Sequence, residues 1–202
     1  MFTGIVSHIA KIEKITHDLN FDSFLTISLA KKSIKKKLKI GSSIACNGIC
    51  LTLISQKIIE EKIFLDFSAS KETFDKTTLK DFKTNDFINV EFSLKIGDEL
   101  GGHLVLGHID DTAKIIDIST SKDSWIFVFE LKEYFKKFIV KKGSITVNGV
   151  SLTVNNLTKN SFDVNIINHT FNHTTFKYLQ KNQLINLEVD VIARYVNASN
   201  LQ

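Results

Sequence analysis

Short runs of β-branched and aromatic residues, each bounded by Gly, Asn, Asp or Ser, recur along the whole chain. Such runs are typical of β-strands, and they lie at residues 24–29, 62–67, 87–92, 124–129, 144–147 and 162–167. About six short strands per 100 residues predict an all-β fold of small barrels or sandwiches, which dispose of free sheet edges by closing.

Three stretches have helical spacing instead. Residues 33–38 and 131–138 carry charged side chains at that spacing, at corresponding places before two Gly-Ser strands, and they predict short connecting helices. Residues 191–196 place Ile192, Tyr195 and Val196 on one helical face. A helix this short is not stable alone, so we expect it to dock on its own domain or on a neighbouring subunit.

The chain also contains an internal repeat. Four landmarks return in the same order about 100 residues later, an offset too long for a solenoid repeat of about 20–50 residues. They are Gly4-Ile5-Val6 with Gly107-His108-Ile109, Asn47-Gly48-Ile49-Cys50-Leu51-Thr52 with Asn148-Gly149-Val150-Ser151-Leu152-Thr153, Thr73-Phe74 with Thr170-Phe171, and Asn89-Val90-Glu91 with Asn186-Leu187-Glu188. We therefore predict two homologous domains, residues 1–102 and 103–199.

Each copy has an Asn-Gly pair, the strongest short hairpin signal. In the first hairpin Cys46 would face Ile49 rather than Cys50, which argues against a disulfide. The position after the turn holds Cys50 in one copy and Ser151 in the other. A nucleophile needs a base that the sequence alone does not place, so two interpretations stay open: a nucleophile, or a small residue of the strand.

Composition and charge narrow the possible functions. The 202 residues are 43% hydrophobic, and the net charge of +4 comes from 26 basic and 22 acidic residues. Arg194 is the only arginine in the sequence. Because bidentate reading of bases and phosphates relies on arginine, we expect no nucleic-acid partner. No stretch of 18 apolar residues and no signal-peptide pattern occur, so we expect no membrane contact and a cytoplasmic location.

Histidines could indicate a metal, but their spacing argues against it. His103 and His108, with Asp110 or Asp111 beside them, are five apart and would point to opposite faces of a strand. His169 and His173 have helical metal spacing, but the other copy has Glu72 and Lys76 there. We predict no metal. Phosphate-loop, dinucleotide and zinc-protease motifs are missing from the sequence as well.

The features that remain sit at equivalent places in both copies: Cys or Ser followed by Leu-Thr, a Gly-flanked His, and a Thr-rich loop. They suit one polar, planar small molecule per domain. Paired sites also suggest a reaction between two copies of one ligand.

The motifs resemble those of riboflavin synthases of the α-chain type. The resemblance runs from residue 1 to about residue 196 and rests on Met1-Phe2-Thr3-Gly4-Ile5-Val6, Cys46-Asn47-Gly48-Ile49-Cys50-Leu51-Thr52, Gly101-Gly102-His103-Leu104-Val105-Leu106-Gly107-His108, residues 142–153 and Asn186-Leu187-Glu188-Val189-Asp190. It implies two homologous six-stranded antiparallel Greek-key β-barrels and a C-terminal helix through which three chains form a homotrimer.

The resemblance also implies the reaction. Each barrel would hold one 6,7-dimethyl-8-ribityllumazine, and one lumazine would donate a four-carbon unit to the other. The products are riboflavin and 5-amino-6-(D-ribitylamino)uracil, with no cofactor. In this family the first barrel of one subunit faces the second barrel of the next. Association with a lumazine synthase capsid stays open.

Site residues carried over by motif fall into two groups. For the first barrel they are Gly4, Ile5, Val6, Cys50, Leu51, Thr52, Ser68, Ala69, Ser70, Lys71, Glu72 and Thr73. For the second barrel they are Gly107, His108, Ile109, Lys142, Ser151, Leu152, Thr153, Asn165, Ile166, Ile167, Asn168, His169 and Thr170. The candidates for the proton transfer and for nucleophilic addition at lumazine C7 are His108, Ser151 and Thr153, with His103, Cys50 and Phe2 shaping the pocket.

Two departures from the family pattern concern the second site: Asn168 stands where the family usually has Pro, and Asn148 where it often has Asp. Two rival functions remain. A non-catalytic lumazine or flavin binder, such as an optical antenna protein, would be expected to lose one site and the trimer, whereas this chain keeps both sites and the tail. A flavin-reductase-type barrel would need a nucleotide-binding domain for which the chain has no room.

Overall fold

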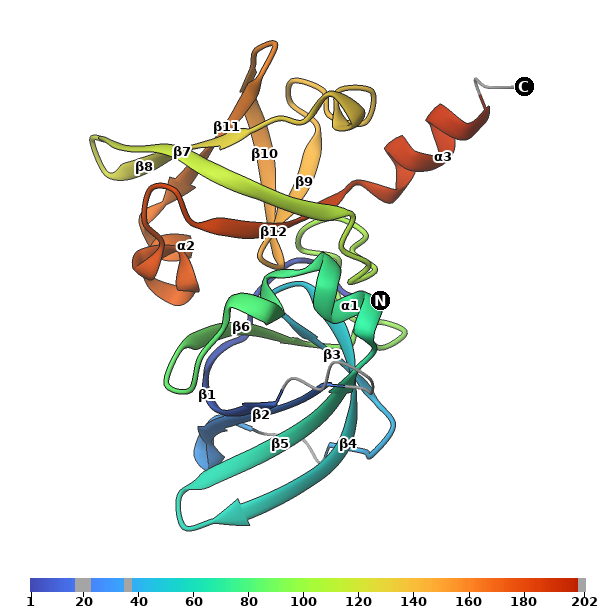
Figure 1. Cartoon of the computed structure of the whole chain (residues 1–202), viewed down its shortest axis with the longest axis vertical. Helices are drawn as coiled ribbons and strands as arrows, with labels where there is room; N and C mark the ends of the chain where they lie inside the picture. Colours follow the sequence, from blue (N-terminus) through green and yellow to red (C-terminus); the bar gives the residue numbers. More distant parts are fainter. Residues whose placement is uncertain (17–22, 35–37, 200–202) are drawn as a thin grey trace.

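The computed structural model describes residues 1–16, 23–34 and 38–199, and these form two closed antiparallel β-barrels stacked along the long axis of the molecule (Figure 1). The strands of the first barrel are β1 (His8–Thr16), β2 (Ser23–Ala30), β3 (Ser43–Cys46), β4 (Ile49–Ile59), β5 (Lys62–Ala69) and β6 (Phe87–Phe92). Those of the second are β7 (Asp111–Ser121), β8 (Ser124–Glu130), β9 (Ser144–Val147), β10 (Val150–Leu157), β11 (Ser161–Ile167) and β12 (Leu184–Val189).

The two barrels share one topology. The first closes in the order β1-β2-β5-β4-β3-β6, and the second repeats that cyclic order with the equivalent strands β7 to β12. This is the Greek-key arrangement that the family resemblance implies, and the all-β prediction is confirmed. Register shifts occur at matching places, after Ile12 and Ile115 and after Leu53 and Val154. Because β-bulges bend a strand, these long strands can curve around their barrels.

Short helical segments connect the strands. Helix α1 (Lys71–Lys76) and the 3-10 turn η2 (Thr78–Asp81) follow β5, while α2 (Asn168–His173) and η4 (Thr175–Tyr178) follow β11. The connecting helix predicted over 131–138 is too long, because the structure has a 3-10 helix only at η3 (Glu133–Phe135), with Phe135 buried in the core. For 33–38, the turn η1 (Lys31–Ser33) overlaps only the first residue, and 35–37 lie outside the described residues.

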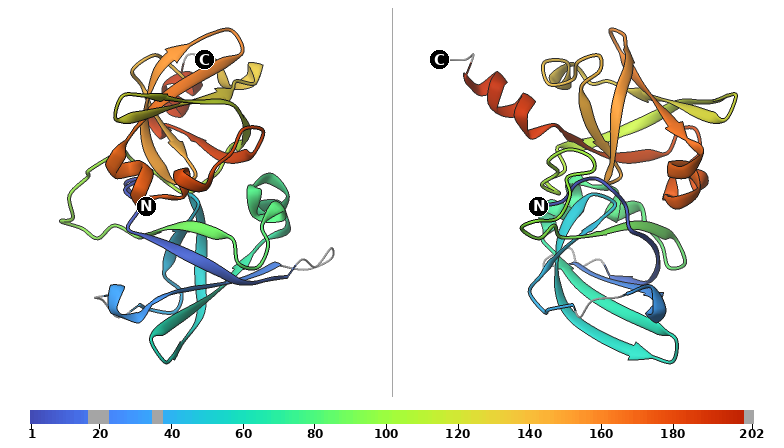
Figure 2. Two further views of the ribbon diagram at one scale, coloured as in Figure 1. Left: turned by 90° about the vertical axis from the view of Figure 1, so that its left-hand side faces the viewer. Right: turned by 180° about the vertical axis from the view of Figure 1, so that it is seen from behind.

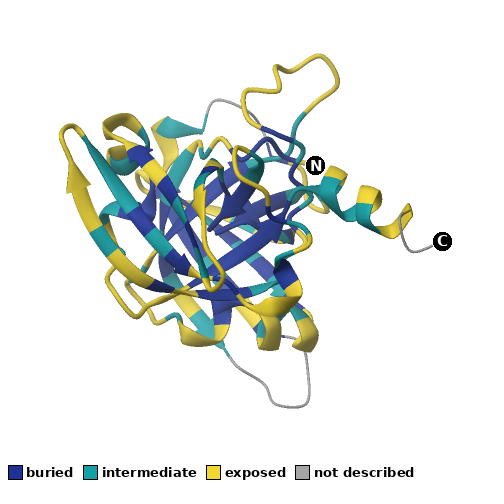
Figure 3. Ribbon diagram, turned by 90° about the horizontal axis from the view of Figure 1, so that it is seen from above, coloured by how far each residue is buried: buried dark blue, intermediate teal, exposed yellow. Residues whose placement is uncertain are grey.

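Each barrel has its own hydrophobic core, and buried positions follow the strands while the hairpin ends are exposed (Figure 3). Two side chains cross between the barrels. Val6, from the segment before the first barrel, packs against the second core, and Ile109, from the segment before the second barrel, packs against the first core. The lead-in segments are therefore exchanged between the barrels.

The Asn-Gly turns meet back to back between the barrels. Both turns have positive φ at both residues, 46° and 80° at Asn47-Gly48 and 48° and 79° at Asn148-Gly149, as a two-residue type I′ hairpin requires. A Cβ on Gly48 would lie 2.8 Å from the Gly149 nitrogen, and one on Gly149 would lie 2.6 Å from the Gly48 nitrogen. Only glycine permits this approach, which places the pseudo-twofold axis between the turns.

Four buried asparagines tie the turns together. The side-chain oxygen of Asn47 accepts from the backbone N–H of Asn89 at 2.7 Å, while the Asn89 amide donates across the interface to the Asn148 carbonyl at 2.9 Å. The symmetric bonds run from Asn186 N–H to the Asn148 side-chain oxygen (2.8 Å) and from the Asn186 amide to the Asn47 carbonyl (3.0 Å). Each barrel thus donates into the hairpin turn of the other.

The C-terminal helix α3 (Val191–Ser199) projects away from the second barrel (Figures 1 and 2). The Arg194 guanidinium lies 3.1 Å from the Asp110 carboxylate at its base. The apolar face stays open: Ile192, Tyr195 and Val196 are 62%, 71% and 53% exposed. Of the two docking partners predicted for this segment, its own domain does not cover that face. None of the described helices is long and apolar enough to cross a membrane.

Candidate active site

Each barrel carries one hollow that contains candidate chemistry. The Cys50 site, on the first barrel, has a volume of about 300 Å³ and is lined by Ile49, Cys50, Glu72, Thr73, Lys76, Thr77, Gly107, His108 and Ile109. The Ser151 site, on the second, has a volume of about 460 Å³ and is lined by Ile5, Gly101, Gly102, Ser144, Ser151, Leu152, Thr153, Asn155, Asn165, Ile167 and Thr170. A larger hollow of about 640 Å³ between η2 and η4 has no histidine, cysteine or serine in its lining, so we place the chemistry at the two smaller ones.

The two sites exchange their glycine segments, which corrects the grouping expected from the sequence. The backbone N–H of Ser151 donates to the Gly4 carbonyl at 2.8 Å, and that of Cys50 donates to the Gly107 carbonyl at 2.9 Å. Residues 4–6 therefore accompany the second barrel, and residues 107–109 accompany the first. Repeat-equivalent segments look alike in sequence, and only the packing around the pseudo-twofold axis decides which barrel each one faces.

Close backbone contact explains the glycines in these segments. Gly4 (φ +76°) and Gly107 (φ +80°) both lie in the left-handed region, where side chains are strained. A Cβ on Gly4 would stand 2.6 Å from the Ser151 Cβ, and one on Gly107 would stand 2.6 Å from the Cys50 Cβ. Each glycine segment therefore lies directly on the second residue after the Asn-Gly turn of the other repeat, Ser151 for Gly4 and Cys50 for Gly107.

The Ser151 hydroxyl, which lines the hollow, pairs with the imidazole of His103, a buried residue outside the lining. The His103 Nδ1 lies 2.7 Å from the Ser151 Oγ, and its Nε2 lies 3.0 Å from the Thr146 Oγ1. Two hydroxyls therefore orient the imidazole, while the backbone N–H of His103 donates to the Thr3 carbonyl at 3.1 Å and holds the residue in place. Burial lowers the pKa of His103, which favours the neutral ring. A serine hydroxyl bonded to a neutral, oriented imidazole is a typical activated nucleophile.

The Cys50 site has a half-buried thiol instead of the serine. Both cysteines are free, as the hairpin register predicted, since Cys46 faces Ile49 across the turn. Cys46 is fully buried, and burial raises the pKa of its thiol, which makes it a core residue. Cys50 instead lines the hollow, with His108 on the facing segment. The structure gives Cys50 features of both interpretations left open for it, because it lines the hollow and also packs against the cluster of Phe2, Ala45 and Val105.

Several predicted site residues lie elsewhere. Leu51, Ala69 and Ile166 are buried in the barrel cores, where strand alternation turns them inward. Phe2 is fully buried and belongs to a small cluster with Ala45, Val105 and Cys50, beneath the site rather than in it. Other predicted residues also lie outside the two linings: Gly4, Val6, Thr52, Ser68, Ser70, Lys71, His103, Lys142, Asn168 and His169. Ser70 instead caps α1 by accepting from the Thr73 N–H.

Two residues of the Ser151 site escaped the sequence analysis although a signal was present: Ser144 lines the hollow, whereas Thr146 is buried and bonds to His103. The two-residue turn at Asn148-Gly149 fixes the register of β9 and β10, so Thr146 lies opposite Ser151 and Ser144 lies opposite Thr153. Hairpin counting alone could have found Ser144 and Thr146. The curvature of β10 brings Asn155 into the lining of the Ser151 site. The placement of α1 brings Lys76 and Thr77 into the lining of the Cys50 site.

Helix α2 closes one side of the Ser151 site. It carries Thr170 into the lining, and its Phe171 stacks on Trp125 of β8 with the ring centroids 3.8 Å apart and the planes 4° from parallel. His103 and His108 belong to different sites, and the described residues contain no group of three or more His, Cys, Asp or Glu side chains placed to hold a metal ion.

Comparison with known proteins agrees with this architecture. The lumazine binding domain model matches residues 3–93 and 106–190, one match per barrel. Two solved structures titled as LumP complexed with riboflavin and with 6,7-dimethyl-8-(1'-D-ribityl) lumazine superpose with TM-scores of 0.81 and 0.79 over 94% of this chain and 99% of theirs, at 22% and 21% identity. The fold and the paired sites thus define a tandem lumazine-binding protein.

Curated relatives specify the family further. The chain is 38% identical over 197 residues to the riboflavin synthase of Brucella abortus, covering 96% of both chains, and 39% identical over 197 residues to that of Buchnera aphidicola, covering 97% of this chain and 92% of the relative. It is 36% identical to the Escherichia coli enzyme over 191 residues, or 94% and 87% of the two chains. The chain belongs to the riboflavin synthase family.

Proposed function

We propose that this chain is a riboflavin synthase, a transferase that converts two molecules of 6,7-dimethyl-8-ribityllumazine into one riboflavin and one 5-amino-6-(D-ribitylamino)uracil. The observation that carries the proposal is the pair of equivalent sites, one on each barrel, built from matching residues such as Cys50 and Ser151 or Thr73 and Thr170. A reaction between two identical molecules needs two such places.

The chemistry requires only groups that the chain supplies. One lumazine gives up a four-carbon unit, made of C6, C7 and their methyl groups, by breaking two carbon–nitrogen bonds. The other accepts the unit on its own two methyl carbons. The atoms of the two substrates equal those of the two products, so the balance calls for no external oxidant or reductant. Holding both rings in a reactive geometry can contribute about 7–11 kcal/mol to lowering the barrier.

We assign individual roles to three groups of the two sites. Ser151, bonded to neutral His103, is the nucleophile that adds to C7 of the donor lumazine, or the group that directs a water there. His108, on the segment over the Cys50 site, is the base for the 7-methyl proton of the acceptor lumazine. Thr153 and Thr170 supply hydroxyls to the polar edge of the bound ring.

The assembly forms part of the proposal. Three chains associate through the exposed face of α3, so that the Cys50 site of one subunit faces the Ser151 site of the next. We further propose that the enzyme works in the cytoplasm and that the functional boundary between the two lumazine-binding units lies at residue 102. Mixing with a lumazine synthase would test whether the two enzymes associate.

The test is to incubate the purified protein with 6,7-dimethyl-8-ribityllumazine alone and to quantify both products over time. We expect riboflavin and the pyrimidine in equal amounts over many turnovers. We also expect Ser151→Ala to lower kcat by about 100-fold, a typical cost of removing a nucleophile or general acid–base group. Tight lumazine binding without riboflavin would refute the proposal and identify a carrier or antenna protein.

A further inference from the structure

Two buried glutamates stand at equivalent positions that the mechanism above does not use. Glu91 on β6 and Glu188 on β12 are 7% and 2% exposed, and neither forms an ion pair within the described part of the chain. Burial raises the pKa of both carboxyls. Burying a carboxylate without a cation is costly, so its retention at both positions calls for a specific role.

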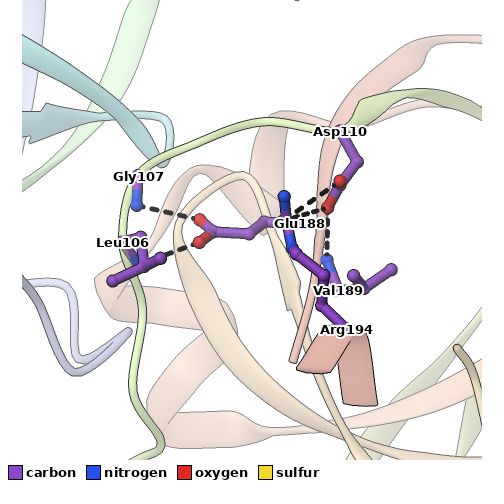
Figure 4. A network of polar contacts seen from close by, with 6 residues as sticks. All are labelled: Leu106, Gly107, Asp110, Glu188, Val189 and Arg194. Atoms are coloured by element: carbon purple, nitrogen blue, oxygen red, sulfur yellow. Dashed lines mark hydrogen bonds and ion pairs between the residues drawn. The ribbon is translucent and has the colours of Figure 1, made fainter. Parts of the chain in front are cut away.

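Each carboxylate holds two consecutive backbone N–H groups of a glycine segment. Glu91 accepts from Thr3 N–H at 2.7 Å and from Gly4 N–H at 3.0 Å, and also from the Thr3 hydroxyl at 2.9 Å. Glu188 accepts from Leu106 N–H at 2.8 Å and from Gly107 N–H at 3.0 Å (Figure 4). A carboxylate with one oxygen on each N–H fixes both the position and the orientation of the segment.

The segments held in this way belong to the site of the opposite barrel. The carbonyl of Gly4, which Glu91 of the first barrel holds, accepts from the Ser151 backbone N–H. The neighbouring Thr3 carbonyl accepts from the His103 backbone N–H. Gly107, held by Glu188 of the second barrel, accepts from the Cys50 N–H. Each glutamate therefore bonds directly to a glycine segment, and that segment bonds in turn to the site of the opposite barrel.

We propose that Glu91 and Glu188 are positioning residues that act crosswise, with Glu91 of the first barrel setting the geometry of the Ser151–His103 pair and Glu188 of the second barrel setting the cover over Cys50. The importance of this positioning for turnover rests on the proposed function, but the crosswise geometry can be tested without turnover. Each site then depends on both barrels of its own chain.

Alkylation of Cys50 tests one half of the proposal. Cys46 is fully buried, so brief treatment of the full-length protein with iodoacetamide, with the product located by peptide mass spectrometry, reports on Cys50. Glutamine has one acceptor oxygen where glutamate has two, so Glu188→Gln loosens the Gly107 segment. We expect it to speed Cys50 alkylation about tenfold through local opening, while Glu91→Gln, in the same barrel as Cys50, stays within about twofold of wild type.

NMR of the His103 imidazole tests the other half of the proposal, the effect of Glu91 on the Ser151–His103 pair. We expect Glu91→Gln to move the His103 ring resonances and the midpoint of their titration in an NMR spectrum, and Glu188→Gln to leave both unchanged. Each variant is thus the matched control of the other, since both remove one buried charge at an equivalent position. If a glutamine variant does not fold, Glu→Asp at the same position keeps the charge, withdraws the oxygens and should give the same crosswise pattern more weakly.

Three results would overturn the proposal. They are an effect confined to the site of the same barrel, an equal effect of both variants on both sites, and no change at either site in folded variants. If the protein formed no riboflavin but the crosswise pattern appeared, the proposed function would fail while the positioning role stood.

Discussion

At the scale of single residues, the Ser151 site is defined by the way in which burial and hydrogen bonding act on His103. Hydroxyls occupy both ring nitrogens, and no acidic side chain accepts from either of them among the described residues. Desolvation is the main cause that lowers the His103 pKa. A neutral imidazole can accept the Ser151 proton, whereas an imidazolium cannot.

A prediction at the residue scale concerns the titration of His103 and the pH dependence of stability. We expect the His103 titration midpoint, followed by NMR of the ring protons, to lie below the ordinary value of 6.5. The unfolded chain then binds a proton that the folded chain excludes as the pH falls below 6.5. The contribution of neutral His103 to the free energy of unfolding is therefore present above that pH and is lost as the pH decreases.

The pKa values of Glu91, Glu188 and Asp110 are raised, so these carboxyls make the folded chain more stable as the pH falls, opposite to His103. Comparing wild type with His103→Gln isolates the contribution of His103 from theirs. Urea unfolding of both proteins on either side of pH 6.5 should show a larger loss of stability in acid for wild type. A His103 midpoint at or above the ordinary value would contradict the prediction.

At the scale of elements, the two hairpins β3–β4 and β9–β10 join the barrels as well as closing them. The glycines of their turns touch, and Asn89 and Asn186 of the sixth strands donate into the turns of the opposite barrels. The same two side chains also accept from the N–H groups that start η4 and η2, at Thr175 and Thr78. One asparagine thus connects a strand, a turn and a helical segment.

We expect Asn89→Ala to lower the free energy of unfolding by about 3 kcal/mol, because it leaves the buried Thr175 N–H and the Asn148 carbonyl without a partner. Asn156→Ala is a suitable control, since Asn156 is exposed and bonds only to Asp163 within its own barrel. The control should change stability by less than about 0.5 kcal/mol. Equal decreases in the free energy of unfolding for the two substitutions, measured by urea unfolding, would contradict a specific contribution of the interface bonds to stability.

At the scale of the whole molecule, one chain supplies two sites and a helix that its own barrels leave uncovered. Arg194 and Asp110 anchor the base of α3, while Ile192 and Tyr195 point into solvent. The apolar face of an amphipathic helix is normally buried, and in the proposed assembly copies of α3 from neighbouring chains bury it. Three such helices would bring sites of neighbouring chains together.

If the chain forms the proposed trimer, we expect Ile192→Asp combined with Tyr195→Asp to convert it into single chains of 22.8 kDa, measured by light scattering or sedimentation. Riboflavin formation should fall with it, because two sites from different subunits no longer meet, while circular dichroism should show intact barrels. Lys159→Asp, at the exposed turn between β10 and β11, changes the net charge by the same two units and should leave the oligomeric state and the activity unchanged. A wild-type protein that is monomeric and active would exclude the proposed assembly.

The sequence by itself determined the repeated, all-β architecture, because strand runs, Asn-Gly turns and recurring glycines are local signals that tertiary packing does not alter. It also determined the hairpin register that separates Cys46 from Cys50, and it pointed to both sites through Cys50, Ser151 and the Thr-rich loops. Only the tertiary structure decided which glycine segment serves which barrel. Gly4 and Gly107 are equivalent in sequence, and their exchange follows from packing around the pseudo-twofold axis. The bonds from His103 to Ser151 and from the glutamates to the opposite sites likewise join residues far apart in the chain, which no local pattern can reveal.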